Sequence, residues 1–215
     1  LDAVARNILD TWRATRENQY TDDTGEPSTL RGSLQLVFSD LGTPNEKRWD
    51  AYHELRSKLV EGGMPLDAVR FMHEAKNDAA KGRLFAAARS GHIAVLIGST
   101  EKMGVGTNVQ ARLVAMHHVD CPWRPADLEQ RDGRGIRQGN QNADVAVFRY
   151  VVERSFDAYS WQTVARKAGF IAQVMKGDPS VRSIDDIGDT ALSAAEAKAL
   201  ASGNPLVLER ANAEA

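Results

Sequence analysis

The sequence is poor in features that define several large classes of protein. Cys121 is the only cysteine among 215 residues, which excludes a disulfide-held scaffold and favours a reducing compartment. No run approaches the roughly 20 apolar residues that a membrane-spanning helix needs, and no stretch has the pattern of a signal peptide. We therefore expect a cytoplasmic protein without a membrane partner. The first residue is Leu1 rather than methionine, which suggests a piece of a longer polypeptide.

Neither positive nor negative charge is in large excess. The formal net charge is −2 and the isoelectric point is near 6.2, so the chain is not a uniformly basic nucleic-acid coat. Any contact with nucleic acid must come from a local patch. Hydrophobic residues make up 42% of the chain, which is enough for a real core. The length fits one domain, or one domain with an appended helical piece.

The sequence lacks the residue patterns that nucleotide binding and metal binding need. There is no GxxxxGK[ST] phosphate loop and no Asp-Glu pair after a strand to hold magnesium, so the chain alone lacks a nucleotide cradle. His117 and His118 would point to opposite faces of a strand and cannot share an ion, so we expect no metal site. Cys121 has no base near it in the sequence, and we interpret it as a buried thiol.

Apolar runs of strand length alternate with segments of helical periodicity. This alternation predicts α/β architecture, with a parallel sheet covered by helices on both faces. We divide the chain into an N-terminal helix and loop (1–33), the α/β domain (34–177) and an acidic, alanine-rich helical tail (178–215). The expected strands are 34–42, 68–73, 92–100, 111–120 and 143–152, and the expected helices are 1–19, 46–63, 74–91, 125–138 and 155–177.

One short stretch, "QRDGRGIRQGNQ" at 130–141, combines arginines with helix-weakening glycines. If 126–138 is helical, Gln130, Arg134 and Arg137 share one face. Guanidinium groups match phosphate oxygens in a bidentate manner, and Gly133 and Gly135 would let a large ligand approach closely. The alternative is an ordinary surface helix whose arginines pair with Glu129 and Asp132.

The predicted fold also indicates which segments could bind a ligand. In an open parallel sheet, ligands bind outside the carboxyl ends of the strands. Three polar stretches follow predicted strands there: "EAKND" at 74–78, "GSTEKMGVGTN" at 98–108 and "DCPWRP" at 120–125. We expect a functional surface to be built from them.

These segments together resemble a known family. Across 34–176 they match, in order and spacing, motifs IV, V and VI of the second RecA-like lobe of superfamily 2 helicases, and within that superfamily the Swi/Snf-type translocases of double-stranded DNA. Motif VI, Gln-x-x-Gly-Arg-x-x-Arg, is complete at 130–137. "VFSDLGTP" at 37–44, "GSTEKMGVGTNVQ" at 98–110 and the tail are similar to large phage and plasmid proteins that join a DNA methylase to such a helicase, some of which act against host restriction.

The resemblance implies a RecA-like lobe, of the P-loop NTPase type, that completes an ATP site. ATP with Mg²⁺ would lie between two lobes, the first of which carries the phosphate loop and the magnesium site and is absent from this chain. Arg137 would be the arginine finger, with Arg134 also facing the γ-phosphate and Gln130 in support. Such a finger contributes about 10³ to 10⁵ in rate. Gly133 would allow lobe and nucleotide to close together.

The resemblance also implies contacts with double-stranded DNA. Gly104, Gly106 and Asn108 would couple the ATP cleft to the DNA, and Asn108 stands where many helicases carry aspartate, as in the duplex translocases. The contacts would be to phosphates rather than bases. Trp123 has a second interpretation, as a packing tryptophan at a turn. The residues implied in DNA contact are Lys81, Ser99, Thr100, Lys102 and Trp123.

The expected partners are therefore DNA, the first helicase lobe and a methylase domain of the same polypeptide, encoded by a bacterium or a phage. Two other functions remain open. The chain could be a module that holds DNA or a partner domain without turning over ATP. A nucleotide-binding enzyme of different chemistry is disfavoured by the missing cradle.

Overall fold

The computed structural model describes residues 1–22, 24–45, 47–103, 108–152 and 155–176. The predicted tail at 178–215 lies outside them. The chain divides into two compact units, one formed by Leu1–Asp120 with Leu128–Tyr150 and the other by Cys121–Asp127 with Val151–Ala215. The first unit contains all five strands of the sheet.

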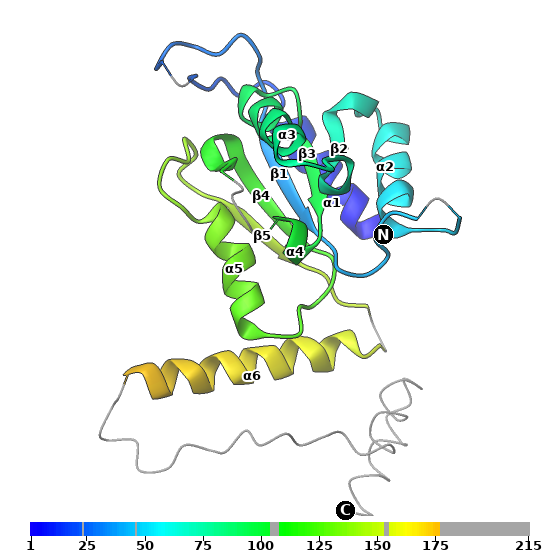
Figure 1. The fold of residues 1–215 in the computed structure, drawn as a ribbon, viewed down its shortest axis with the longest axis vertical. Coiled ribbons are helices and arrows are strands. Elements are labelled where there is room, and N and C mark those ends of the chain that lie inside the picture. The colour runs from blue at the N-terminus through cyan, green and yellow to red at the C-terminus, as the bar shows by residue number, and fades with distance from the viewer. Residues whose placement is uncertain (23, 46, 104–107, 153–154, 177–215) are drawn as a thin grey trace, which may run out of the picture. The chain divides into compact units, whose positions relative to one another are not determined.

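Five parallel strands form the sheet of the first unit, in the spatial order β2-β3-β1-β4-β5 (Figure 1). Each strand lies within a segment expected to be one, which confirms the predicted parallel α/β sheet. The expected segments were longer than the strands because they included loop residues before or after them. The strands are β1 Leu34–Phe38, β2 Val69–Phe71, β3 Val95–Gly98, β4 Leu113–His118 and β5 Ala146–Arg149.

The helices alternate with these strands. Two of them begin at the side-chain caps that local sequence provides: Asp50 accepts a hydrogen bond from His53 N (2.9 Å) and Asn77 accepts one from Ala80 N (2.8 Å). The helices are α1 Asp2–Thr15, α2 Ala51–Glu61, α3 Asp78–Ser90, α4 Thr100–Met103, α5 Pro125–Gly135 and α6 Asp157–Lys176, with 3₁₀ turns at Leu66–Ala68, Met72–Glu74 and Gln110–Arg112.

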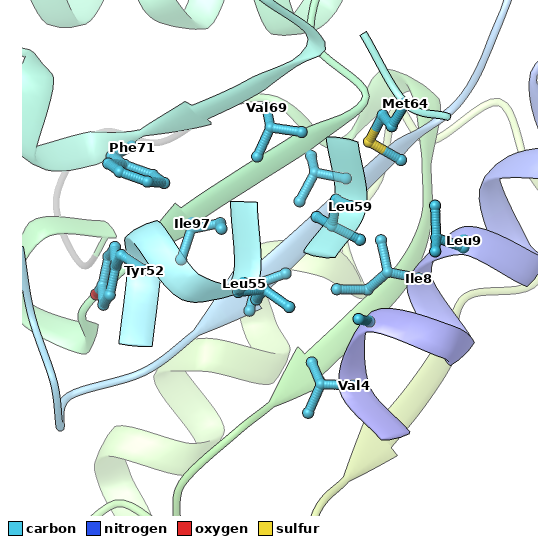
Figure 2. Close-up of a cluster of buried hydrophobic side chains, with 13 residues drawn as sticks. Val4, Ile8, Leu9, Tyr52, Leu55, Leu59, Met64, Val69, Phe71 and Ile97 are labelled. Carbon is cyan, nitrogen blue, oxygen red and sulfur yellow. The ribbon is translucent and has the colours of Figure 1, made fainter. Parts of the chain in front are cut away.

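One face of the sheet is covered by α1 and α2. Ile8 of α1 and Leu59 of α2 are fully buried in one apolar cluster with Val69 and Ile97 of the strands (Figure 2). Burying a side chain of this size stabilises a fold by about 1.5–3 kcal/mol. The N-terminal helix therefore shares its core with the sheet of the first unit.

The opposite face is covered by α3 and by the second half of α5. Leu84 and Phe85 of α3 pack in a second cluster with Leu36 and Leu96. Gly135 brings α5 against β4, since a Cβ there would lie 2.3 Å from Met116 Sδ. The two faces thus carry different helices: β1 leads into α2 on one face, while β4 leads into α5 on the other. A crevice beside the carboxyl end of β1 is the usual consequence of such a switch.

Candidate functional site at the carboxyl ends of the strands

A buried arginine joins three strand ends at the carboxyl edge of the sheet, beside β1. Arg131 of α5 is 1% exposed. Its Nη2 donates to Asp40 Oδ2 (2.7 Å) and to Asp120 Oδ1 (3.1 Å), its Nε donates to Thr100 Oγ1 (2.8 Å), and its Nη1 donates to the Asp120 carbonyl (2.9 Å). These partners follow β1, β3 and β4, so one guanidinium fixes the position of α5 on the sheet.

The two carboxylates around Arg131 also hold the loops that carry them. Asp120 Oδ2 accepts hydrogen bonds from Asp40 N (2.5 Å) and Leu41 N (2.7 Å). Asp40 accepts from Thr100 N (2.6 Å) and from the Thr100 hydroxyl (2.8 Å). Charge-assisted bonds of this kind are about twice as strong as neutral ones. The loops after β3, β1 and β4 are therefore joined to one another by hydrogen bonds at the carboxyl edge of the sheet.

The predicted array of Gln130, Arg134 and Arg137 is placed differently from expectation in one respect. Because α5 ends at Gly135, Arg137 lies in the bend after the helix. The expectation that all three residues share one helical face was wrong for Arg137. Gln130 and Arg134 remain one turn apart on α5, with Gln130 exposed and Arg134 half-buried. Arg137 is exposed.

The acidic neighbours of this array do not neutralise it. Asp132 Oδ1 lies 3.0 Å from His118 Nε2, and Asp132 Oδ2 accepts from Arg149 Nη2 at 3.4 Å. Within the described ranges no ion pair joins Arg134 or Arg137 to a carboxylate, and Glu129 forms none. The alternative in which Glu129 and Asp132 pair with these arginines is therefore not what the structure contains.

The glycines of the segment have separate roles. A Cβ at Gly133 would meet nothing within 4 Å, so the surface beside it is open. Gly135 is buried against β4, and its predicted role in admitting a ligand was wrong because Met116 and Leu113 occupy the space beside it. Gly139 has a φ of +90°, the left-handed region that glycine adopts without strain. One of the three glycines thus leaves open surface.

The residues expected to couple ATP to DNA are only partly described. Gly104 and Gly106 lie outside the described residues. Asn108 is exposed, and its carbonyl accepts a hydrogen bond from Arg89 Nη1 (3.1 Å). The structure therefore places the end of this loop beside α3, without describing its glycines.

The residues expected to contact DNA are scattered. Ser99 and Thr100 follow β3, and both hydroxyls are already engaged: Ser99 Oγ accepts from Lys102 N (3.2 Å), and Thr100 Oγ1 bonds Asp40 and Arg131. Lys102 is exposed on α4. Lys81 lies on α3, with Nζ 3.5 Å from Asp78 Oδ1.

Trp123 belongs to the second compact unit and is 84% exposed. It therefore does not pack within its own unit, and its contact with DNA stays a prediction. Cys121, which we expected to be a buried thiol, is half-buried. Both residues lie in the short segment between β4 and α5.

The two histidines of β4 face opposite sides of the sheet, as the strand pattern predicted. His117 Nε2 lies 3.0 Å from Gln35 Oε1 and its Nδ1 lies 2.8 Å from the Tyr150 hydroxyl. Burial, with a smaller effect from His118, lowers the pKa of His117 to about 3, so the ring is neutral. His118 stacks on Phe38 on the other face. Among the described residues, no cluster of three or more His, Cys, Asp or Glu side chains is placed to hold a metal ion.

The sequence alone did not reveal Arg131 or Asp40 as members of the site. A usable signal was present: Asp40 and Asp120 each stand two residues beyond the end of a buried strand, as Thr100 does after β3. Side chains at equivalent positions after adjacent parallel strands meet at one edge. Three such residues, one arginine and an α/β crossover together predict a buried charge cluster.

Fold and site together define a three-layer α/β domain whose strand ends are tied by a buried arginine, and in which Arg134 and Arg137 form no ion pair with the described residues. No model of a known protein family matches the chain. A curated protein does: "Defense against restriction protein B" of Escherichia phage P1 is 36% identical over 141 residues, 66% of this chain. The match spans 6% of that protein's length. It confirms the predicted resemblance to phage proteins that act against restriction.

Two solved structures are also similar. One is the C-terminal part of the Fun30 ATPase domain, at 19% identity with a TM-score of 0.45 over 60% of this chain and 38% of that one. The other is S. cerevisiae Dbp5 L327V bound to RNA and ADP BeF3, at 20% identity with a TM-score of 0.48 over 64% of this chain and 32% of that one. Likenesses of this size carry no functional conclusion. No described helix is long and apolar enough to cross a membrane.

Proposed function

We propose that this chain is the C-terminal lobe of an ATP-dependent DNA translocase or helicase of superfamily 2. In this proposal, ATP and Mg²⁺ are held by another lobe, which supplies the phosphate loop. Arg137 and Arg134 approach the γ-phosphate, and Gln130 supports them. The chain corresponds to a small part of its phage relative, so the other lobe, a methylase domain and the activity of the whole protein are all part of the proposal.

The observation that carries the proposal is a difference in bonding among three arginines of one segment. Arg131 is buried and bonded to three residues, whereas Arg134 and Arg137 form no ion pair within the described parts of the chain. A guanidinium fork without a carboxylate partner is available for a phosphate. The rigid attachment of Arg131 supplies what an arginine finger needs, a fixed support for a group that acts on developing charge.

The same edge of the sheet offers a connection to DNA. Thr100 bonds both Asp40 and Arg131, and the segment after it contains Lys102, Gly104, Gly106 and Asn108. A displacement of α5 by nucleotide would therefore act on the residues after β3. The proposed contacts to duplex DNA, which would be made to phosphates, are Lys81, Ser99, Thr100, Lys102 and Trp123. In this proposal Gly104, Gly106 and Asn108 couple the ATP site to the DNA.

The test is ATP hydrolysis by the full-length protein that contains this chain, with and without duplex DNA. We expect DNA-stimulated turnover in the wild type and a loss of about 10³-fold or more in Arg137→Ala, while DNA affinity stays nearly unchanged. Arg83→Ala removes an exposed arginine from α3 and is the matched control, which should keep wild-type turnover.

Two results would contradict this assignment. Equal losses of DNA binding and hydrolysis in Arg137→Ala would remove the proposed division of roles. Turnover that is absent from the wild type, or unaffected by the substitution, would favour the alternative function, a module that binds DNA or a partner domain without hydrolysing ATP.

A further inference from the structure

A second buried arginine lies at the opposite end of the sheet. Arg112 directly precedes β4 and is 1% exposed. Its Nη1 donates to the carbonyls of Leu30 (2.9 Å) and Gly32 (3.4 Å), its Nη2 donates to Ser28 Oγ, and its guanidinium lies 5.2 Å from the centre of the Tyr20 ring. Arg112 thus ties the loop at 20–33 to the amino end of the sheet.

The contacts of Arg112 differ from those of Arg131 in charge. Arg131 has two carboxylates within 3.1 Å, whereas the contacts of Arg112 are carbonyls, a hydroxyl and an aromatic ring. Within the described ranges, no carboxylate lies within ion-pair distance of Arg112, and its Nε is buried without a hydrogen-bond partner. Burial lowers the pKa of Arg112. A buried cation without an anion is costly to a fold.

A pocket of about 270 Å³ opens beside this arginine. It also contains Arg89, whose guanidinium forms no ion pair in the described structure and donates to the Asn108 carbonyl. The rest of the lining is mainly hydroxyl and amide groups. The lining residues are Thr21, Asp22, Ser28, Thr29, Ala86, Arg89, Ser90, Ala111, Arg112 and Gln141.

The one carboxylate in the lining is turned toward its own loop. Asp22 Oδ1 accepts hydrogen bonds from Thr24 N (2.9 Å), the Thr24 hydroxyl (2.6 Å) and Glu26 N (3.1 Å). These bonds lower the pKa of Asp22, the hydroxyl of Thr24 having the largest effect. Among its described lining residues, the pocket therefore combines two arginines and several hydroxyls with a single carboxylate, which is bonded to its own loop.

We propose that this pocket binds a phosphate-type oxyanion through Arg112, Arg89 and the hydroxyls of Ser28 and Thr29. Guanidinium forks pair with phosphate oxygens in a bidentate manner, and hydroxyl groups donate to the remaining oxygens. This site differs from the proposed ATP contacts in its residues, because Gln130, Arg134 and Arg137 are not among those that line the pocket. A ligand there would bridge the 20–33 loop and α3.

Inorganic phosphate is the probe, added to the 215-residue chain at constant ionic strength. We expect the midpoint of thermal unfolding to rise with phosphate and the titration to saturate, with a matching heat in isothermal calorimetry. Arg89→Gln should weaken the affinity at least tenfold, about the value of one lost charge-assisted bond. Arg83→Gln, on the same helix but outside this pocket, should leave it unchanged.

A variant that binds phosphate more tightly tests the site without the risk that a loss of affinity comes from misfolding. Asp22→Asn keeps an acceptor for the turn and removes the only carboxylate among the described lining residues, so phosphate should bind more tightly. Acetate and a short DNA duplex are separate arms: tighter binding of acetate would assign a carboxylate, and saturable competition by DNA would assign the phosphate to a nucleic-acid backbone. Phosphate binding that does not saturate, or that is equal in Arg89→Gln and the wild type, would overturn the proposal.

Discussion

Arg131 and Arg137 are six residues apart and depend on opposite properties of the same side chain. Arg131 holds the strand ends through its hydrogen bonds, whereas the role proposed for Arg137 needs a guanidinium without an ion pair, as it has among the described residues. Sequence spacing pointed to Arg137 through the motif and passed over Arg131, since a buried structural arginine and an exposed one look alike in a polar helix. Only the contacts with Asp40, Asp120 and Thr100 separate them.

Arg131 is the residue of the site on which the stability of the fold should depend most. We expect Arg131→Ala to lower the free energy of unfolding by about 3–5 kcal/mol, because it leaves Asp40 and Asp120 close together without their cation. Urea denaturation followed by circular dichroism measures this. Arg137→Ala is the control, and its exposed side chain should change stability by less than about 0.5 kcal/mol. Similar stabilities in the two variants would show that Arg131 does not hold the strand ends.

Between elements, a neutral histidine links parts far apart in the chain. His117 of β4 lies within hydrogen-bond distance of Gln35 in β1 and of Tyr150, whose hydroxyl accepts from Asn7 of α1. Burial is the main cause that raises the pKa of Tyr150 to about 12. The network thus joins the sheet to α1 through uncharged groups.

This network makes folding sensitive to acid. The pKa of His117 is about 3 in the folded chain and near 6.5 when unfolded, so the unfolded state binds the extra proton between these values. Stability from His117 is therefore complete above about pH 6.5 and falls as the pH is lowered toward 3, by about 2 kcal/mol at pH 5. Carboxylates also titrate, so the quantity to measure is the difference between wild type and His117→Gln. An equal loss in both proteins between pH 7 and pH 5 would contradict this role.

The elements themselves were largely predictable, and their ends were not. Strand order and parallel pairing follow from alternating apolar runs and crossovers. The end of α5 at Gly135 does not, because it depends on how closely α5 packs on Met116 of β4. The attachment of the loop at 20–33 could not be predicted for the same reason. Its polar composition predicts a loop, but Arg112 and Gln141, which hold it, are about 80 to 120 positions away in the sequence.

For the whole molecule, the near-neutral net charge sets how it meets DNA. A chain with a net charge of −2 has no general attraction for a polyanion, so binding must come from a few cations near phosphates. We expect weak binding of duplex DNA by the 215-residue chain, independent of sequence, with the logarithm of affinity falling linearly with the logarithm of salt concentration.

The slope of that line tests the proposed contacts. Each phosphate neutralised contributes about −0.9 to the slope, so Lys102→Gln should make it shallower by about one and weaken binding equally on all sequences. Arg31→Gln removes an exposed cation from the 20–33 loop, at the other end of the sheet, and should leave the slope unchanged. Fluorescence anisotropy of labelled duplexes at several salt concentrations measures both. Sequence-selective binding that is insensitive to salt would mean that the chain reads bases, which a motor that must move along any DNA cannot depend on.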